Sequence, residues 1–512
     1  MKLTLIEISC PDTRALGIRG LSAYLESKGI DCTIIFIPPM IERMTAGTQH
    51  RPLYGNRLLN AIANLCKGSD LIGISVLSYY YRYAVQLTHF IKEKTKIPVI
   101  WGGYHAMGFV ENSLEHADFV CIGEGERTLS DLIGKLKEQS GVFDTPNLAY
   151  LNNGIIFKNP LFQLIQNLDD LPFLDYRLNK HYVANPDHND LLILDRDAAI
   201  RLSLMGPLSR ITPHHHYQTF MSRGCPYNCA YCCESMIHDL YKGQKQMRRR
   251  SPENLVQEIQ KVRKELDFID AIAFSDDSFS EASDDCIESF AQLYKKEIQL
   301  PFSAQFSPLT LSQRKLDVLV DAGLRYAEVG IQSGSDLTKR LYRRNVSNDR
   351  ILETCKMLKE KTGKIMPPDY HFIVDNPWET NEDLHSTLNL IFKIPKPRGI
   401  KVSSLVFYPG TELYEKAIKE DRFDRNNVDV FQKNFGALEP KPVNLIFFLA
   451  DIPWIPKKIL ELLNRPCFID MNSKWAKLII KISFTLVSVT QRGIVRIKRV
   501  VSHRKKLSKS NV

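Results

Sequence analysis

Three cysteines lie within eight residues, directly after an apolar segment that reads as a strand. Their spacing is Cys225-x3-Cys229-x2-Cys232, and the aromatic residue Tyr231 precedes the third. Three thiolates can hold three irons of a four-iron cluster and leave the fourth iron open, because soft sulfur ligands suit such clusters. A structural zinc site would need a fourth ligand and usually a second knuckle. Cys233 adjoins the third cysteine and is left out of the set; a zinc knuckle or buried thiols are the alternative.

This motif resembles the cluster-binding motif of the radical S-adenosylmethionine (SAM) superfamily. The resemblance implies that Cys225, Cys229 and Cys232 ligate a [4Fe-4S] cluster whose open iron chelates the amino and carboxylate groups of SAM. One-electron reduction would then cleave SAM to a 5′-deoxyadenosyl radical, which abstracts a hydrogen atom. The resemblance covers about residues 215–420.

Later segments of the same region resemble further motifs of this family. Asp276 and Asp277 follow the second strand, where the family usually contacts the SAM amino group. Either residue could make this contact. Alternatively, either could serve only as the N-cap of a helix. Gln332 and Ser333 end the fourth-strand segment, which lies near the ribose. The family more often has Glu at the first of these positions, and Gln keeps the hydrogen bonds without the charge. Asp375 replaces the usual Gly of the fifth-strand motif.

The first 140 residues alternate short apolar strands with amphipathic helices. We predict strands at 3–8, 33–37, 71–76, 99–101 and 119–122, and helices at 19–28, 84–94 and 127–138. This alternation predicts an α/β fold with a doubly wound parallel sheet. In such sheets the ligand lies beyond the carboxyl ends of the strands.

The residues after three of these strands resemble cobalamin-binding domains. Asp12-Thr-Arg14-Ala-Leu-Gly17 follows the first strand, where that family has Asp-x-His-x-x-Gly and the His ligates cobalt. Arg14 takes the place of this His, and a guanidinium has no lone pair to offer a metal. Ser75 and Leu77 follow the third strand, like the Ser-x-Leu element that receives the displaced nucleotide base.

Glycines follow the fourth strand, in Gly102-Gly103-Tyr-His105-Ala, and would let the backbone approach a bulky ligand. Gly123-Glu-Gly-Glu-Arg-Thr128 matches a segment frequent in cobalamin-linked radical SAM enzymes. Taken in order, these segments predict a cobalamin-binding-like domain; the alternative is the same fold without a corrinoid. We interpret His105 as a packed, hydrogen-bonded side chain and His214-His215-His216 as a solvated loop.

The chain is predicted to divide at residues 140, 214 and 425. A connector at 141–214 contains a hairpin around Asn153-Gly154. Strand–helix alternation then returns, with strands at 217–222, 270–274, 302–307, 325–331, 370–374 and 400–407 and a helix at 252–266. Six such units predict a partial (β/α)6 radical SAM barrel at 215–425. Residues 426–512 are predicted to form a helical extension with a basic tail.

Positive charge is concentrated at the C-terminus. The 512 residues carry a net charge of +10, and residues 471–512 contain eleven basic residues and no acidic one. The rest of the chain is therefore close to neutral, which argues against a nucleic-acid-binding body. Trp475 to Val501 mixes apolar with basic residues, which suits a helix on an anionic membrane surface. A packed terminal helix with a basic end is the alternative.

The sequence shows no apolar run of the 18 or so residues that cross a membrane, and its N-terminus lacks the features of a signal peptide. We therefore expect a cytoplasmic protein, which the tail could place at the inner face of the membrane.

Together these features predict a cobalamin-dependent radical SAM enzyme, a methyltransferase acting on an unactivated carbon. Methylcobalamin would give its methyl group to a substrate radical, and a second SAM would remethylate the cobalt. The alternatives are an oxidative cyclase or rearrangement enzyme without net methylation and, in another class, a non-enzymatic corrinoid or metal-binding protein. Expected partners are a small-molecule or lipid substrate and an electron donor such as flavodoxin or ferredoxin, with no nucleic acid.

Overall fold

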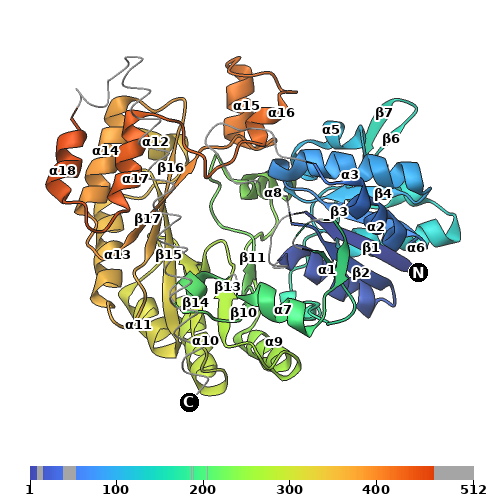
Figure 1. Cartoon of the computed structure of the whole chain (residues 1–512), viewed down its shortest axis with the longest axis horizontal. Coiled ribbons are helices and arrows are strands. Elements are labelled where there is room, and N and C mark those ends of the chain that lie inside the picture. The colour runs from blue at the N-terminus through green and yellow to red at the C-terminus, as the bar shows by residue number, and fades with distance from the viewer. Residues whose placement is uncertain are drawn as a thin grey trace.

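A computed structural model describes residues 1–8, 15–38 and 53–465, except residues 186, 188, 205 and 211. Two sheets, each flanked by helices, lie side by side in the molecule (Figure 1). Asp12, Arg14 and the basic tail lie outside the described residues.

The first sheet has nine strands in the order β7-β6-β5-β4-β3-β1-β2-β8-β9. They are β1 (Lys2–Glu7), β2 (Asp31–Phe36), β3 (Leu71–Ser75), β4 (Val99–Gly102), β5 (Phe119–Cys121), β6 (Leu148–Asn152), β7 (Ile155–Lys158), β8 (Tyr182–Ala184) and β9 (Leu191–Ile193). The central strands run parallel, and β6, β7 and β9 run antiparallel at the two edges. All five strands predicted in the first 140 residues are present, which confirms the doubly wound sheet.

Helices cover both faces of this sheet. One face is covered by α1 (Leu16–Ser27) and α6 (Gly125–Glu138), and the other by α2 (Asn56–Cys66) and α3 (Tyr81–Lys94). The faces alternate along each strand, so that Leu5 packs with the first helix pair and its neighbour Ile6 with the second. Burial on both faces explains why the strands are almost continuously apolar. Short helices α4 (Tyr104–Gly108), α5 (Val110–Leu114) and α7 (Arg196–Ser203) complete this half.

The edges of the first sheet come from the predicted connector. The β6–β7 hairpin turns at Asn153 and Gly154, both with positive φ (50° and 78°), as the sequence predicted. Strands β8 and β9 extend the opposite edge, a role that their short, mixed sequences did not reveal. The division of the chain at residues 140, 214 and 425 stays a prediction.

The second sheet has six parallel strands in chain order. They are β10 (His216–Thr219), β13 (Ala271–Phe274), β14 (Phe302–Phe306), β15 (Leu324–Gln332), β16 (Asp369–Val374) and β17 (Gly399–Ser404). Its flanking helices are α9 (Pro252–Glu265), α10 (Asp284–Glu297), α11 (Gln313–Ala322), α13 (Asn348–Glu360) and α14 (Asn381–Lys393), with the short α12 (Asp336–Leu341) between β15 and α13. Each of the six predicted strands is found. The edge strands β10 and β17 are not hydrogen-bonded to each other, so the barrel is open, as predicted.

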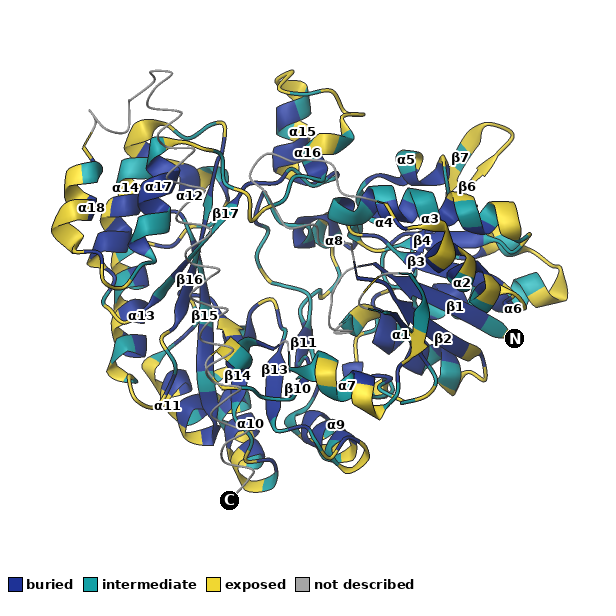
Figure 2. Cartoon of the chain, viewed as in Figure 1, coloured by how far each residue is buried: buried dark blue, intermediate teal, exposed yellow. Residues whose placement is uncertain are grey.

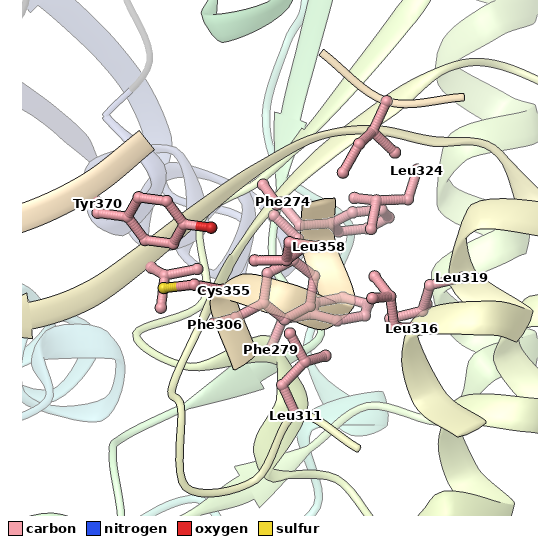
Figure 3. Packing of buried hydrophobic residues seen from close by; sticks show 14 of the residues in the cluster. Phe274, Phe279, Phe306, Leu311, Leu316, Leu319, Leu324, Cys355, Leu358 and Tyr370 are labelled. Carbon is pink, nitrogen blue, oxygen red and sulfur yellow. The ribbon is translucent and has the colours of Figure 1, made fainter. Parts of the chain in front are cut away.

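Buried aromatic and leucine side chains join the strands of this barrel to its helices. Figure 3 shows Phe274 and Phe306 of the strands among Leu316 and Leu319 of α11 and Leu358 of α13. This core fixes the outer wall of the barrel, so that the inner strand faces are left to line a cavity.

The interpretation of His214-His215-His216 as a solvated loop is wrong for His216, while His214 and His215 lie in a loop before β10 and are partly buried. His216 opens β10 and is 6% exposed, with its Nε2 3.2 Å from the backbone nitrogen of Leu208. The backbone nitrogen of His215 donates to Asp270 at 2.7 Å. Pairing with β13 draws this segment into the sheet, which the polar character of three histidines concealed.

The described part of the predicted extension, residues 426–465, contains α16 (Val428–Phe431), α17 (Pro442–Ala450) and α18 (Lys457–Leu463), and α15 (Glu412–Lys419) precedes it. Phe431 is fully buried against the rings of Tyr81 and His105, and Arg82 pairs with Asp429 at 2.8 Å. The segment after the barrel thus packs back onto the first sheet. In the described part of the chain, every helix is too short or too polar to cross a membrane.

A two-stranded ribbon of β11 (Ser222–Arg223) and β12 (Arg248–Arg249) docks the barrel onto the start of α6. Arg223 pairs with Glu126 at 2.7 Å, and Arg248 pairs with Glu124 at 2.8 Å. All four side chains are mostly buried, so each charge depends on its partner. These pairs explain the acidic residues of the Gly-Glu-Gly-Glu segment as part of a contact between the two sheets.

Gly123, beside this contact, should not tolerate a side chain. Its φ is +87°, and a Cβ there would overlap the hydroxyl of the buried Tyr241. Gly123→Ala should therefore cost about 1 kcal/mol for the backbone and about 1–3 kcal/mol more for the overlap. Gly154→Ala is the matched control, because its φ is +78° and no atom lies within 4 Å. Urea unfolding of both variants measures the difference; equal midpoints would contradict the packing.

Candidate functional site

The cysteine loop joins β11 to α8 (Glu234–Leu240) and is fixed at its start by Asp276. This buried carboxylate accepts the backbone N–H groups of Met221 at 3.1 Å and Ser222 at 2.6 Å. Burial raises the pKa of Asp276 even though these hydrogen bonds lower it. Its oxygens hold the strand end that leads into the cysteines, and it does not line either cavity described below.

The middle of the loop is held between two other segments of the barrel. The backbone nitrogen of Ala230 donates to the carbonyl of Tyr342 at 3.2 Å, and its carbonyl accepts from Leu413 at 3.0 Å. A turn between Cys229 and Cys232 is closed by a backbone hydrogen bond of 2.9 Å. Two distant segments therefore fix the orientation of the thiols.

All three predicted ligands, Cys225, Cys229 and Cys232, line one cavity of about 370 Å³ inside the barrel. Burial raises the pKa of both Cys225 and Cys232 to about 12. Without metal these thiols are protonated, and metal binding would release their protons. Cys233 precedes α8 and is not part of the cavity wall.

Alternate residues of the inner strand faces line the rest of this cavity, as Glu328, Gly330 and Gln332 do on β15. Gln332 has a φ of +74°, at a bulge in the pairing with β16. Its predicted companion Ser333 is turned away, because its hydroxyl lies 3.1 Å from that of Thr387 in the interior. Tyr231 lines the cavity beside the cysteines and meets the ring of Tyr342 edge-on.

Arg344 is a site residue that the sequence analysis missed. Its Nη2 donates to the carbonyl of Gly330 at 2.6 Å, and its Nη1 lies 3.8 Å from the sulfur of Cys229. The guanidinium places a fixed positive charge beside the cysteines. It follows a short helix in an Arg-Arg pair, and no local pattern distinguishes it from the exposed Arg343.

The donor set of this cavity fits a four-iron cluster with a zwitterionic amino acid beside it. Three thiols, the cation Arg344 and the carboxyl of Asp277 line this one cavity. Among the described residues, no three Cys, His, Asp or Glu side chains converge on one metal ion. A four-iron cluster does not require three side chains around a single ion, because each thiolate binds a different iron.

A second cavity, of about 440 Å³, lies between the two sheets. Its walls include Ser75, Gly102 and Gly103 at the carboxyl ends of β3 and β4, as predicted, together with the Arg223 ribbon. Its deeper part reaches Gly73, where a Cβ would come within 2.7 Å of the Leu5 side chain. This glycine-lined hollow with an apolar floor fits a bulky planar group.

One predicted cobalamin contact, Leu77, is not brought to this cavity, and His105, which was predicted to be packed, also lies outside its walls. Leu77 is 36% exposed and lies outside its walls. His105 is fully buried, with its nitrogens 3.0 Å from the Ser78 hydroxyl and 3.3 Å from Asn112, and burial lowers its pKa to about 4. The interpretation of this histidine as a packed side chain is confirmed.

The two cavities share a wall at Glu234 and Asp277. Tyr104, which follows the paired glycines of the first sheet, donates its hydroxyl to Glu234 of the barrel. Asp277 is open to the cavities but surrounded by protein, and burial with the nearby Glu234 and Asp276 raises its pKa to about 7. Of the two acids predicted at this strand end, Asp277 is therefore the one at the site.

Fold and site together define an enzyme with two adjoining cofactor cavities, one in a partial barrel and one against a doubly wound sheet. Residues 9–133 match the B12 binding domain, and residues 219–391 match the radical SAM superfamily. The chain is therefore a radical SAM enzyme with a B12-binding domain, and its cofactors are a [4Fe-4S] cluster, SAM and cobalamin.

Similar proteins agree with this assignment. An uncharacterized methyltransferase, PH0819, of Pyrococcus horikoshii is 25% identical over 358 residues, which cover 68% of this chain and 69% of the relative. Bacteriochlorophyllide d C-8(2)-methyltransferase of Chlorobaculum tepidum is 22% identical, with 68% of each chain covered. The structure of the radical SAM methyltransferase TsrM from Kitasatospora setae, with cobalamin and a [4Fe-4S] cluster bound, shares the fold. Its TM-score is 0.62 at 14% identity, over 82% of this chain and 78% of that one.

The raised pKa of Asp277 predicts a pH-dependent effect of its removal. The folded protein keeps a proton that the unfolded chain releases near its ordinary pKa of 3.8, so this group lowers stability as pH rises towards 7. Asp277→Asn should therefore unfold at a higher temperature than the parent at about pH 8, with the difference shrinking towards about pH 5. Thermal unfolding of both cofactor-free proteins across this range measures the effect. A gap that stays constant with pH would contradict the raised pKa.

Proposed function

We propose that this enzyme transfers a methyl group from cobalamin to an unactivated carbon of its substrate. The shared wall at Glu234 and Asp277 is the observation that carries this proposal. A methyl group stored in one cavity can reach a substrate in the other only where the two compartments meet. The names of the two curated relatives support methylation as the outcome.

When bound, the cluster and SAM supply a 5′-deoxyadenosyl radical, and cobalamin supplies the methyl group. Cys225, Cys229 and Cys232 would hold the cluster through thiolates. Arg344 would pair with the SAM carboxylate and Asp277 with its amino group, because opposite charges in a shielded wall bind a zwitterion at both ends. We assign Gln332 to the ribose hydroxyls, and Tyr231 and Asp276 to holding the cysteine loop.

In the second cavity, Ser75 would contact cobalamin through its hydroxyl. Gly102 and Gly103 would contact it through their backbone atoms. We also propose that Asp12 and Arg14 contact cobalamin. Arg14 would not ligate cobalt, since a guanidinium offers no lone pair. Contacts of Leu77 with the corrinoid and of Ser333 with SAM remain predictions that the observed geometry does not favour.

The substrate would lie in the barrel, between the cysteines and the inner faces of β15 and β16. Glu328 and His371 stand 3.6 Å apart in this wall. Burial would raise the pKa of Glu328, but His371 and Arg210 outweigh it and keep the carboxyl ionised. This pair suits a polar substituent on a small molecule. Phe435 also lines this cavity and lies beside Tyr79, which follows β3, with ring centres 6.3 Å apart.

An electron donor such as flavodoxin or ferredoxin would reduce the cluster. We place the enzyme in the cytoplasm, and we infer that the basic segment 471–512 attracts it to anionic membrane lipids. A lipid substrate would then be reached at the membrane face.

Product analysis with SAM that carries a trideuterated methyl group tests the proposal. The anaerobically reconstituted, reduced protein is given a small-molecule extract. It should yield S-adenosylhomocysteine and 5′-deoxyadenosine in about equal amounts, because one SAM supplies the methyl group and another the radical. A substrate heavier by a CD₃ group should appear. Deoxyadenosine without S-adenosylhomocysteine would instead indicate a cyclase or rearrangement enzyme, and neither product would indicate a non-enzymatic protein.

Gly102→Val separates the role of the corrinoid cavity from that of the barrel. Gly102 lines this cavity, and a Cβ there would meet its nearest neighbour, the Cβ of Cys121, at an ordinary contact distance of 3.8 Å, so we expect valine to narrow the cavity without a backbone clash. Formation of S-adenosylhomocysteine should fall at least about tenfold while deoxyadenosine persists. Gly55→Val is the control, because nothing lies within 4 Å of its Cβ position and it is remote from both cavities. Equal loss of both products would contradict two separate cavities.

A further inference from the structure

The C-terminal extension carries three exposed, large apolar side chains, close together in the sequence, that line neither cavity. Trp454 is 76% exposed, and Ile459 and Leu462 of α18 are 48% and 55% exposed. The two aliphatic residues are three positions apart on one side of the helix. Figure 2 shows α18 at the outer edge of the barrel, with much of its surface exposed. We call these three residues the Trp454 face.

The turn that presents Trp454 is fixed to the barrel rather than loose. The amine of Lys396 donates to the carbonyls of Pro453 at 3.0 Å and Ile455 at 3.3 Å, on either side of the indole. Ile455 and Leu460 are buried in the barrel core beneath. The chain therefore buries the neighbouring apolar residues and holds the largest one in water, where an exposed apolar surface is unfavourable.

Basic residues lie close to this face in the sequence. Lys457 pairs with Glu461 at 3.3 Å, while Lys458 and Arg465 form no ion pair with any described residue. The chain then continues into residues 471–512, with eleven basic residues and no acidic one. The basic residues near the Trp454 face and the tail carry the same sign of charge and repel each other. Binding of the tail to this face is therefore unfavourable, and a second copy of the face is disfavoured for the same reason.

We propose that the Trp454 face docks on the surface of an anionic lipid bilayer. An indole suits the boundary between headgroups and acyl chains, because its ring is apolar and its N–H is polar. Ile459 and Leu462 would enter the apolar layer beside it, and the lysines would meet lipid phosphates. The proposal adds a folded contact to the attraction expected of the tail, and it does not depend on methyl transfer.

Vesicle sedimentation of the full-length protein tests this inference. The vesicles are phosphatidylcholine with about one third phosphatidylglycerol, and phosphatidylcholine alone for comparison. Trp454→Ala and the double variant Ile459→Ser/Leu462→Ser should each bind the anionic vesicles at least about fivefold more weakly than the parent. Ile155→Ser and Leu337→Ser are matched controls, since both side chains are 61% exposed on other surfaces, and they should bind like the parent. Circular dichroism confirms that each variant is folded.

Three outcomes would overturn the proposal. The full-length protein could fail to sediment with anionic vesicles. Removal of residues 471–512 could abolish binding while Trp454→Ala leaves it unchanged, which would assign the contact to the tail alone. Trp454→Ala could instead change the oligomeric state in gel filtration, which would make the face an interface between copies. A blue shift of tryptophan emission with anionic vesicles, absent in Trp454→Phe, would support docking directly.

Discussion

A cluster held by three thiolates with one iron free requires three cysteine side chains that line the same cavity. The loop here meets that constraint through contacts made outside it. The carboxylate of Asp276 fixes its start, and the backbones of Tyr342 and Leu413 hold its middle at Ala230. The segments that carry these partners, after β13, at the end of α12 and in α15, therefore position the cysteine loop.

The second constraint is that the two cofactor compartments must meet. Buried pairs of Arg223 with Glu126 and Arg248 with Glu124 lock the barrel ribbon onto the first sheet. Gly108 of α4 and Gly410 after β17 approach so closely that a Cβ on either would strike the other segment. Such contacts bring Glu234 and Asp277 to a wall common to both cavities, and the C-terminal extension packs across both halves.

Much of the fold and the cysteine site could be predicted because their signals are local. Apolar segments predicted the strands, and the spacing of the cysteines predicted the cluster ligands. What failed depends on tertiary contacts. Asp276 and Asp277 are neighbours in sequence, yet one is enclosed by the backbone and the other faces both cavities. Arg344 acquires its role only when its helix places it beside Cys229. His216 looked solvated in the sequence because nothing local to it reveals the pairing with β13 that buries it.

The iron and sulfide content of single cysteine variants tests the central claim most directly. After anaerobic reconstitution, Cys225→Ala, Cys229→Ala and Cys232→Ala should each lose most of the about four irons and four sulfides that the parent holds. Cys233→Ala should retain them, because its side chain is not part of the cavity wall. Full iron and sulfide in any of the first three, or their loss in Cys233→Ala alone, would contradict the account.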